Sequence, residues 1–580
     1  MDSKFKINCT EGFRAEYEIK EENDKTFIEI SAFSEKADKL NLWLTWFEEA
    51  TATGATFSPT GHIGRTIVPD WGGWNYHHAC GSAPFYSSVD YNDKNNLAIA
   101  CQDALNYVGI QLGLEEETCR FKCGVHVRID YDIKEYKTVV LIDKRPLPFY
   151  QVAQEVSKWW EMTPGYEPTN VPEDTREPFY STWYSFHQHT DAEEILKELE
   201  KAKNYGCKGV IVDDGWQTDS NSRGYDYCGD WEPFTGKIPD MKAFVDGVHK
   251  LGMKILLWYG VPMMGKKAKN IKKFEGKFIA GNVESGGTFD PRYPEVREYL
   301  KNIYVKAQKE WGLDGFKLDF VDSFHSNYPN IEKASFAPGK DCDSIYVGVD
   351  KLLKDVLTTL KEVNPDIMIE FRQSYIGPLM RTYGNIFRAA DCPADSRVNR
   401  LDILTLRIFS GKTTIQSDMI MWNVNDTAEN AAFQFTNILF AVPQISMRWD
   451  ALPESHQKML KFYVDFWKKH KTTLLDGEMF YKDYHAGFNF ASAWDENCQV
   501  GAIYGSELGY INKKSKEINI VNATMNEEIY VKNCAGEIKG TYKILNCMGD
   551  TVEDGNIILK NGINSFNIPV NGILVISGDN

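Results

Sequence analysis

A lysine and two aspartates alternate with apolar residues near the middle of the chain. The stretch runs Gly315-Phe-Lys-Leu-Asp-Phe-Val-Asp322, and its pattern predicts a short buried strand that carries charge at its carboxyl end. Lys317 and Asp319 lie two residues apart on one face of that strand, and buried charges are costly unless they share a polar pocket. A cation keeps a nearby carboxylate ionised, and an ionised carboxylate in a sheltered site is a nucleophile. A structural ion pair at a strand end is the alternative interpretation.

Other segments in the middle of the chain also have the composition of short strands. The candidate strands are Tyr180–Phe186, Gly209–Asp213, Lys254–Tyr259, Gly315–Phe320, Ile367–Phe371, Ile386–Ala390, Thr413–Ser417 and Gln444–Trp449. Helical patterns separate most of them, and the first helix begins with a predicted capping box from Thr190 to Glu193. Strands that alternate with helices in this way predict a (β/α)8 TIM barrel, whose catalytic residues lie at the carboxyl ends of the strands.

Polar or aromatic residues follow each predicted strand, and together they define a candidate ring of functional side chains. The ring consists of His187, His189, Asp213, Asp214, Trp216, Trp258, Tyr259, Lys317, Asp319, Asp322, Arg372, Gln373, Ser374, Asp391, Asp395, Asp418, Trp422, Arg448, Trp449 and Asp450. Helix capping explains one or two of the aspartates, and for Asp418 capping and sugar binding are equally good interpretations. A whole ring of such residues at one end of a barrel predicts an active site there.

The ring contains carboxylates and indoles but lacks the spacing of a metal centre. His187 and His189 share one loop without a clear third ligand. Neither a phosphate-binding Gly-rich loop nor a G-x-S-x-G elbow follows a strand. We therefore predict no metal and no cofactor. Two carboxylates across a barrel mouth, among Trp and Arg side chains, are the apparatus of glycoside hydrolysis.

Composition narrows the class of protein. A chain of 580 residues with 43% hydrophobic and 13% aromatic residues is globular and long enough for several domains. The formal charge of −17 and the lack of a basic run argue against a nucleic-acid partner. The amino terminus has no signal-peptide core, no later segment is long and apolar enough for a bilayer, and the 12 cysteines have no metal-site rhythm. We predict a cytoplasmic protein with reduced thiols and no membrane association.

Three composition zones predict three domains. Short alternating runs split by Gly, Asn and Asp predict an antiparallel N-terminal β-sandwich domain over residues 1–175. The βα alternation assigns residues 176–475 to the (β/α)8 catalytic barrel. Alternating runs return over residues 476–580, which we predict to be a C-terminal antiparallel β-sandwich.

Several of these segments resemble glycoside hydrolase family 36, the α-galactosidases of the clan that also holds families 27 and 31. They are Val212-Asp-Asp-Gly-Trp216, Leu257-Trp258, Phe316-Lys-Leu-Asp-Phe320 and the region of Asp391. The layout of a β domain, a barrel and a β-sandwich is similar too. The resemblance implies that Asp319 is the nucleophile, that Lys317 contacts the sugar, and that Asp213 and Asp214 bind its 4- and 6-hydroxyls.

The resemblance also implies an acid/base in the segment Ala390-Asp-Cys-Pro-Ala-Asp395, which has one residue more between its aspartates than the family pattern. Asp391 is our choice and Asp395 the alternative, with Asp395 otherwise a substrate-binding residue. The remaining substrate-binding residues that we predict are Trp216, Trp258, Arg372 and, from the first domain, Trp74. A packed turn is the alternative role of Trp74.

Two departures from the family pattern concern the substrate more than the reaction. Trp258-Tyr-Gly-Val-Pro-Met-Met follows the third strand, where the family has a W-x-E-P-E-M-type segment. Arg372-Gln-Ser-Tyr-Ile-Gly-Pro follows the fifth, where the family has a C-x-x-G-G-G-R-type loop.

The predicted function is a retaining exo-acting hydrolase of terminal α-galactosides, acting on a small oligosaccharide or glycoside. An α-galactosyl transglycosylase and an α-N-acetylgalactosaminidase are alternatives within the enzyme class. A catalytically silent sugar-binding protein is the alternative outside it, and the joint presence of Lys317, Asp319 and Asp391 argues against that. Homo-oligomer formation stays open.

Overall fold

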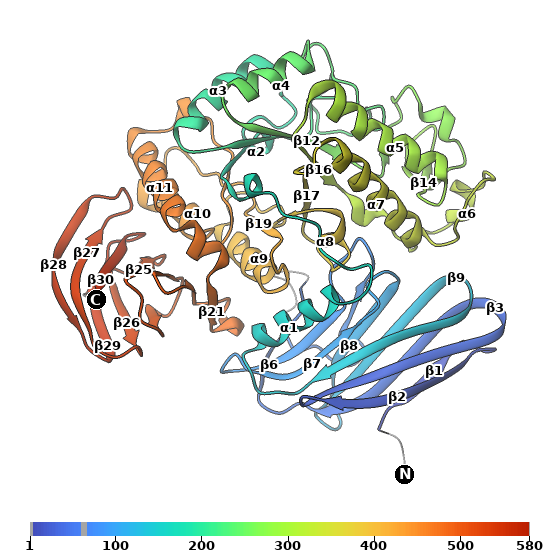
Figure 1. Cartoon of the computed structure of the whole chain (residues 1–580), viewed down its shortest axis with the longest axis horizontal. Coiled ribbons are helices and arrows are strands. Elements are labelled where there is room, and N and C mark those ends of the chain that lie inside the picture. Colours follow the sequence, from blue (N-terminus) through green and yellow to red (C-terminus); the bar gives the residue numbers. More distant parts are fainter. Residues whose placement is uncertain (1–3, 60–65, 579–580) are drawn as a thin grey trace.

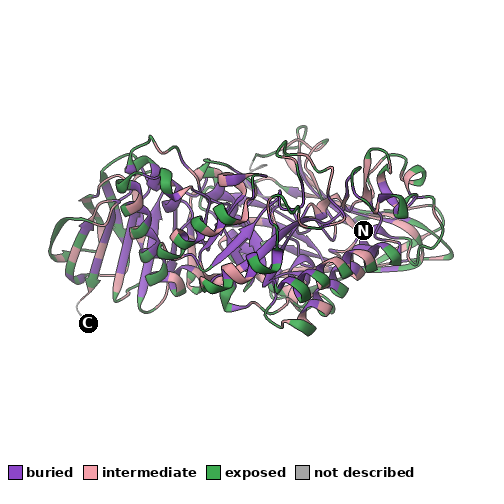
Figure 2. Ribbon diagram, turned by 90° about the horizontal axis from the view of Figure 1, so that it is seen from above, coloured by how far each residue is buried: buried purple, intermediate pink, exposed green. Residues whose placement is uncertain are grey.

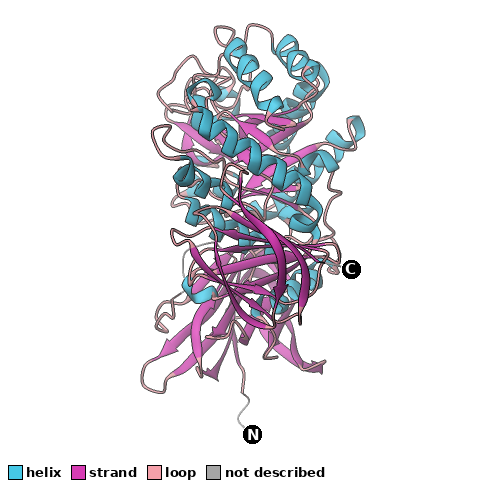
Figure 3. Ribbon diagram, turned by 90° about the vertical axis from the view of Figure 1, so that its left-hand side faces the viewer, coloured by secondary structure: helices cyan, strands magenta, loops and turns pink. Residues whose placement is uncertain are grey.

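The computed structural model of the chain describes residues 4–59 and 66–578 (Figure 1). An N-terminal layer of long antiparallel strands lies beside a barrel, and the C-terminal strands lie next to both, with β21 near the N-terminal strands. Figure 3 shows the helices gathered around the barrel and the two strand-rich parts free of long helices apart from α1. The fold class that the sequence predicts is therefore confirmed.

The N-terminal part is built around two very long strands. β3 and β9 contain 25 and 24 residues and pair with each other in antiparallel register. Their burial alternates along the chain, so one face packs on an apolar core that includes Leu42, Leu44 and Val125. The strands are β1 (Lys6–Cys9), β2 (Arg14–Glu22), β3 (Lys25–Glu49), β4 (Thr53–Phe57), β5 (Trp74–His77), β6 (Phe85–Asp90), β7 (Asn95–Cys101), β8 (Tyr107–Glu115) and β9 (Arg120–Asp143).

Parallel strands form the barrel in the order in which they occur in the chain. They are β10 (Phe179–Ser181), β11 (Gly209–Val212), β12 (Lys254–Gly260), β16 (Gly315–Asp319), β17 (Met368–Arg372), β18 (Ile386–Arg388), β19 (Thr414–Gln416) and β20 (Gln444–Ile445). Single parallel bridges from Gln416 to Val442 and from Ile420 to Ile445 nearly close the circle between β19 and β20. Figure 2 shows the barrel as the buried centre of the molecule, with exposed helix faces outside.

Helices alternate with these strands and cover the barrel. The main ones are α3 (Ala192–Asn204), α4 (Met241–Lys250), α5 (Pro294–Lys306), α7 (Ile345–Val363), α9 (Ser396–Phe409), α10 (Ala428–Thr436) and α11 (Glu454–Asp476). The connection between β17 and β18 contains only the short α8 (Met380–Tyr383). α1 (Phe149–Glu161) leads from the N-terminal strands to the barrel, and the short α6 (Ile331–Ala334) packs on a small hairpin sheet of β13 (Met263–Met264), β14 (Phe278–Asn282) and β15 (Gly286–Phe289).

Two local predictions for the first βα unit are wrong. The first strand ends at Ser181 rather than Phe186, because the chain turns into the short helix α2 (Trp183–Phe186). The N-cap of α3 is Asp191, whose side chain accepts a hydrogen bond from the backbone N–H of Glu194 at 3.0 Å. A capping box that starts at Thr190 is thus displaced by one residue, since Asp191 offers an equally good acceptor.

The C-terminal part packs two sheets around an apolar core. One sheet contains β21 (Glu478–Lys482), β22 (Phe490–Trp494), β23 (Cys498–Ile503), β25 (Glu517–Asn522), β27 (Ile538–Leu545), β28 (Thr551–Leu559) and β30 (Ile573–Gly578), and the other contains β24 (Leu508–Ile511), β26 (Glu528–Asn533) and β29 (Gly562–Asn567). β23 pairs with β25 in parallel, as does β24 with β26, so the prediction of a purely antiparallel sandwich is wrong. The chain crosses to the second sheet between β23 and β25, and such a crossover is what lets two neighbouring strands run parallel.

No helix among residues 4–59 and 66–578 is both long enough and apolar enough to cross a membrane. The cytoplasmic location and the domain boundaries remain predictions.

Candidate active site

Asp319 occupies the carboxyl end of β16, where hydrogen-bond donors from three other segments converge on it. Its Oδ2 accepts from the indole Nε1 of Trp258, at the end of β12, at 2.8 Å. Its Oδ1 accepts from the Nε of Arg372 at 2.8 Å and from the hydroxyl of Tyr375. The backbone N–H of Phe320 donates to the same oxygen at 2.8 Å. With only 6% of the residue exposed, the carboxylate is fixed in orientation and sheltered from bulk water.

Opposing effects set the charge of Asp319. Burial by itself would raise the pKa of this carboxyl. The charges of Arg372 and Lys317 outweigh that effect, together with the hydrogen bonds from Tyr375 and Trp258, and hold the pKa well below its usual range. Asp319 is therefore ionised at neutral pH. An ionised, oriented and sheltered carboxylate has the properties of a nucleophile.

Lys317 shares this pocket but pairs directly with another aspartate. Its Nζ donates to Oδ2 of Asp213 at 2.6 Å, across the barrel from β16 to the end of β11, and both side chains are almost fully buried. Burial would lower the pKa of Lys317, yet the charge of Asp213 outweighs it and raises the pKa. Arg372 forms the ion pair with Asp319. Lys317 is paired with Asp213 instead, and it lowers the pKa of Asp319 through its charge alone.

Asp214 follows Asp213 directly, and the uncharged side-chain amides of two glutamines hold its carboxylate. Its Oδ1 and Oδ2 accept from Gln217 Nε2 at 2.7 Å and Gln188 Nε2 at 2.6 Å. Burial raises the pKa of Asp214 to about 6, more than the two amide hydrogen bonds can lower it. Asp213 and Asp214 thus form two adjacent buried carboxylates next to Asp319, and an incoming polar group with hydroxyls would find acceptors there.

Asp391 follows β18 and is the open carboxylate of the site. Its side chain is 47% exposed, and Oδ1 accepts from Nη2 of Arg388 at 2.7 Å. Burial alone would raise the pKa of Asp391, but the positive charges of Arg388, Lys317 and Arg372 lower it. Asp395 has a different task, since its carboxylate accepts from the backbone N–H of Val398 at 2.9 Å and caps α9.

The family and fold comparisons bear on this geometry. The Melibiase family model matches residues 168–301, which include β10, β11 and β12. A type blood α-D-galactosamine galactosaminidase from Flavonifractor plautii is 24% identical over 181 residues, and α-galactosidase Mel36A from Lactobacillus acidophilus is 27% identical over 208 residues. These matches cover 28% and 33% of this chain but only 16% and 26% of the two relatives' own lengths.

Among solved structures, the family 36 α-galactosidase AgaA from Geobacillus stearothermophilus, in a variant complexed with 1-deoxygalactonojirimycin, superposes with a TM-score of 0.65. At 12% identity the alignment covers 98% of this chain and 82% of that one, which establishes the shared fold. The chain is thus similar to the α-galactosidase-like proteins of glycoside hydrolase family 36, in sequence over part of its barrel and in fold over nearly its whole length. The resemblance drawn from the sequence motifs is thereby confirmed.

The two predicted tryptophans of the barrel lie one behind the other. Trp258 contacts Asp319, whereas Trp216 is completely buried and donates its Nε1–H to the backbone carbonyl of Trp258 at 3.0 Å. Trp216 packs on Tyr259 and Trp231 and thus supports Trp258 from the core. A direct contact between Trp216 and a substrate stays a prediction.

Sequence reasoning missed the residues that hold Asp391. Arg388 has no exposed surface, and it pairs with Asp391, with Asp418 and, at 3.5 Å, with Glu370. Burial raises the pKa of Asp418 to about 6 and that of Glu370 to about 7. The signal was the same as for Lys317, a charged residue inside an apolar strand, in Ile386-Phe-Arg388 and in Ile369-Glu370-Phe371.

Asp418 is neither a cap of the next helix nor an open sugar ligand. Its carboxylate accepts from Arg388, from the backbone N–H of Cys392 at 2.8 Å and from the hydroxyl of Tyr184 at 2.9 Å. The N-cap of α10 is Thr427 instead. Asp418 therefore fixes the loop that carries Asp391.

Tyr225 and Tyr375 were also missed. The ring of Tyr225, which is 37% exposed, stacks on Trp258 at 6.1 Å between centroids and makes an edge contact with Phe320. Such an open aromatic face beside Asp319 suits the apolar face of a sugar ring. The only signal for it was an aromatic residue in the Ser- and Gly-rich loop after β11.

The first domain reaches the site through its loop at residues 78–82. The backbone N–H groups of Ile376 and Gly377 donate to the carbonyl of Gly81 at 3.1 and 2.9 Å, so this loop braces the segment that carries Tyr375. Trp74 lies in β5, and its ring contacts Tyr76 and His126 of the N-terminal sheets. These contacts match the packed-turn interpretation, and a role of Trp74 in the pocket wall stays a prediction.

The group of possible metal ligands that the described part of the chain brings together lies outside the candidate ring. Within the described residues, the group that comes close enough for an ion is His470, Cys498 and Glu517, on α11 and the C-terminal sheet. His187, in contrast, is engaged with Arg223 at 2.9 Å.

Proposed function

We propose that the chain is a retaining exo-acting glycoside hydrolase that removes terminal α-galactosyl residues. The observation that carries this proposal is the Asp319 carboxylate, ionised, buried and held by Trp258, Arg372 and Tyr375 at the carboxyl end of a barrel strand. Similarity to two relatives supports the substrate class, since they are named as an α-galactosidase and an α-D-galactosamine galactosaminidase.

The reaction proceeds in two balanced steps. Asp319 attacks the anomeric carbon while the glycosidic C–O bond breaks, and the leaving oxygen takes a proton from Asp391. Water then attacks the same carbon and gives a proton to Asp391, and the carboxylate of Asp319 leaves. A retaining pair of this kind holds its carboxyl groups about 5–5.5 Å apart when substrate is bound.

The exposure of Asp391 supports its part in both steps. Its half-open carboxyl can reach a leaving group and a water molecule, and Arg388 and Asp418 keep its loop in place. A negative Asp319 favours the protonated form of a nearby carboxyl, and glycosylation removes that charge. In the free chain the charges of Arg388, Lys317 and Arg372 lower the pKa of Asp391, which suits the base of the second step, and the first step uses the protonated fraction of Asp391. Asp395 is committed to the N-terminus of α9, which makes it the weaker candidate.

Asp213 and Asp214 supply the proposed sugar selectivity. A pocket whose buried carboxylates bond to an axial 4-hydroxyl rejects the equatorial epimer, because the carboxylates would lose their partners. The galactosaminidase relative makes an α-galactosaminide the second candidate substrate. Variants of the Geobacillus enzyme were solved with raffinose and with stachyose, so we propose small oligosaccharides of this kind as the natural substrates.

The test is hydrolysis of nitrophenyl α-galactoside beside the α-glucoside, α-N-acetylgalactosaminide, α-galactosaminide and β-galactoside. We expect the α-galactoside to be preferred, and Asp319→Ala to fold normally yet lose nearly all activity. Azide should restore part of the turnover of that variant and yield a β-galactosyl azide. Preference for a glucoside, or more than a few percent of activity in Asp319→Ala, would refute the proposal. Product yield that rises with added acceptor sugar would identify transfer instead of hydrolysis.

A further inference from the structure

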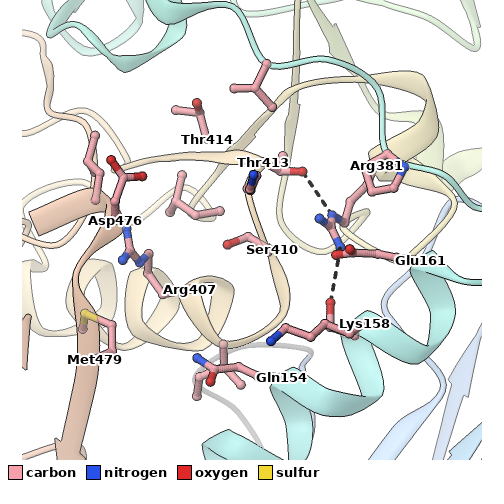
Figure 4. A pocket seen from close by; sticks show the side chains of 18 of the residues that line it. Gln154, Lys158, Glu161, Arg381, Arg407, Ser410, Thr413, Thr414, Asp476 and Met479 are labelled. Atoms are coloured by element: carbon pink, nitrogen blue, oxygen red, sulfur yellow. Dashed lines mark hydrogen bonds and ion pairs between the residues drawn. The ribbon is translucent and has the colours of Figure 1, made fainter. Parts of the chain in front are cut away.

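A second cavity, of about 880 Å³, lies at the end of the barrel opposite to the active site (Figure 4). β19 begins at this cavity with Thr414 and leads to Asp418 in the active site. The walls come from α1, from the loop between α9 and β19, and from the junction of α11 with β21. The cavity thus lies where segments from all three parts of the chain meet, and its volume is that of a small-molecule site.

Every acidic side chain of the cavity wall is already paired. Glu161 accepts from Arg381 at 2.6 Å, and Asp476 accepts from Arg176 at 2.5 Å. Glu478 pairs with Lys513, which lies outside the cavity, at 2.5 Å. Each of these carboxylates thus has a cation of its own, although the charge of Asp476 also acts on Arg407.

Lys158, Arg407 and Lys412 also line the cavity, and within residues 4–59 and 66–578 none of them has an acidic partner. Such an excess is notable in a chain whose formal charge is −17. In Figure 4 the side chain of Lys158 extends into the cavity between Ser410 and Gln154, and Arg407 lies on another side of the cavity with its guanidinium toward Asp476. Two kinds of cation and two neutral donors thus face one volume.

Arg407 is the most constrained of these cations. It lies in the last turn of α9 and is partly buried, and burial lowers its pKa by more than the nearby Tyr481 and Asp476 raise it. The hydroxyl of Tyr481, close to Arg407, is buried and has no hydrogen-bond partner within the described chain. Tyr481 does not line the cavity, but Arg407 does, and a partly buried guanidinium without a hydrogen-bond acceptor is costly unless an anion or water satisfies it.

We propose that this cavity is a binding site for a small phosphorylated molecule, separate from the active site. A planar guanidinium binds phosphate oxygens in bidentate fashion, and two ammonium groups complete the neutralisation of a phosphate monoester dianion. Gln154 and Ser410 provide neutral contacts for the remainder of the ligand. Because the ligand contacts α1, α9 and the α11–β21 junction at once, its binding stabilises the folded chain.

The test measures binding of inorganic phosphate, glucose 6-phosphate, glucose and citrate to the full chain by calorimetry, with thermal unfolding in parallel, at low ionic strength. We expect saturable binding of phosphate and glucose 6-phosphate with a rise in Tm, and none of glucose. Arg407→Gln and Lys158→Gln should each weaken binding about tenfold or more, since each removes a charge-assisted contact. Lys250→Gln, an exposed unpaired lysine on α4, serves as the control and should leave binding unchanged.

Lys412→Gln keeps the test decisive if Arg407→Gln does not fold, because Lys412 is exposed and its loss costs little stability. Absence of saturable phosphate binding, or binding that Lys158→Gln and Lys412→Gln leave intact, would overturn the proposal. Citrate binding as tightly as glucose 6-phosphate would overturn the selectivity for phosphate.

Discussion

Replacing Arg372 by glutamine removes the cation that contacts the proposed nucleophile. The Nε of Arg372 lies 2.8 Å from Oδ1 of Asp319, and 19% and 9% of the two side chains are exposed, so solvent screens this pair only weakly. A hydrogen bond between charged groups contributes about 1.5–3 kcal/mol. At about 1.36 kcal/mol per unit this is a rise of roughly 1–2 units in the pKa of Asp319. The burial that already acts to raise this pKa persists in the variant.

The acid limb of the pH profile reports this change. Only ionised Asp319 attacks the sugar, so activity is lost as the pH falls through its pKa. We expect the acid limb of kcat/KM for nitrophenyl α-galactoside to move upward by roughly 1–2 pH units in Arg372→Gln, and by less in Arg372→Lys, which keeps the charge. In the wild type, the depressed pKa contributes stability above the unfolded value that is lost as the pH falls. The stability gap between wild type and variant should therefore be largest near neutral pH and shrink in acid.

Arg297→Gln is the matched control. Arg297 is also a buried arginine paired with an aspartate, Asp341, at 2.6 Å, but it lies on α5 away from the ring. It should lower stability and leave the pH profile of kcat/KM unchanged. An acid limb that stays in place in a folded Arg372→Gln enzyme, or one that moves equally in Arg372→Lys, would refute the electrostatic role of Arg372.

Three further predictions concern the other carboxylates. For a substrate with a good leaving group, Asp391→Ala should lower kcat and KM together, because deglycosylation slows more than glycosylation. Asp395→Ala should stay active but lose about 0.5–2 kcal/mol of stability, because the cap of α9 is removed. The reverse pattern would make Asp395 the acid/base. Asp214→Asn should reduce kcat/KM by roughly tenfold or more. Since burial raises the pKa of Asp214 to about 6, the wild-type KM should fall as the pH rises through that value, and a KM with the same dependence in Asp214→Asn would exclude Asp214 as its source. Proton NMR of early hydrolysis should show the α-anomer of galactose first, and first appearance of the β-anomer would exclude double displacement.

The sequence alone determined the barrel and the strand ends that carry charge. Alternation places Lys317 and Asp319 on one face of β16 whatever the rest of the chain does, because side chains of a strand alternate with a period of two. The same local logic located β11 with Asp213 and Asp214 at its end, and eight βα repeats imply one barrel with one functional end. The motifs then sufficed to recognise the resemblance to glycoside hydrolase family 36.

Tertiary structure alone decided which of these side chains meet. Lys317 pairs with Asp213, and Arg372 pairs with Asp319. The sequence places all four residues at the carboxyl end of the barrel but does not show which cation pairs with which carboxylate. Tertiary structure also placed Trp216 behind Trp258, Asp395 on a helix terminus, and Arg388 between three carboxylates. Strand stagger and loop conformation set these contacts, and both depend on packing between segments that lie far apart in the chain. A local pattern shows which face a residue occupies, but only the closed barrel shows what lies opposite it.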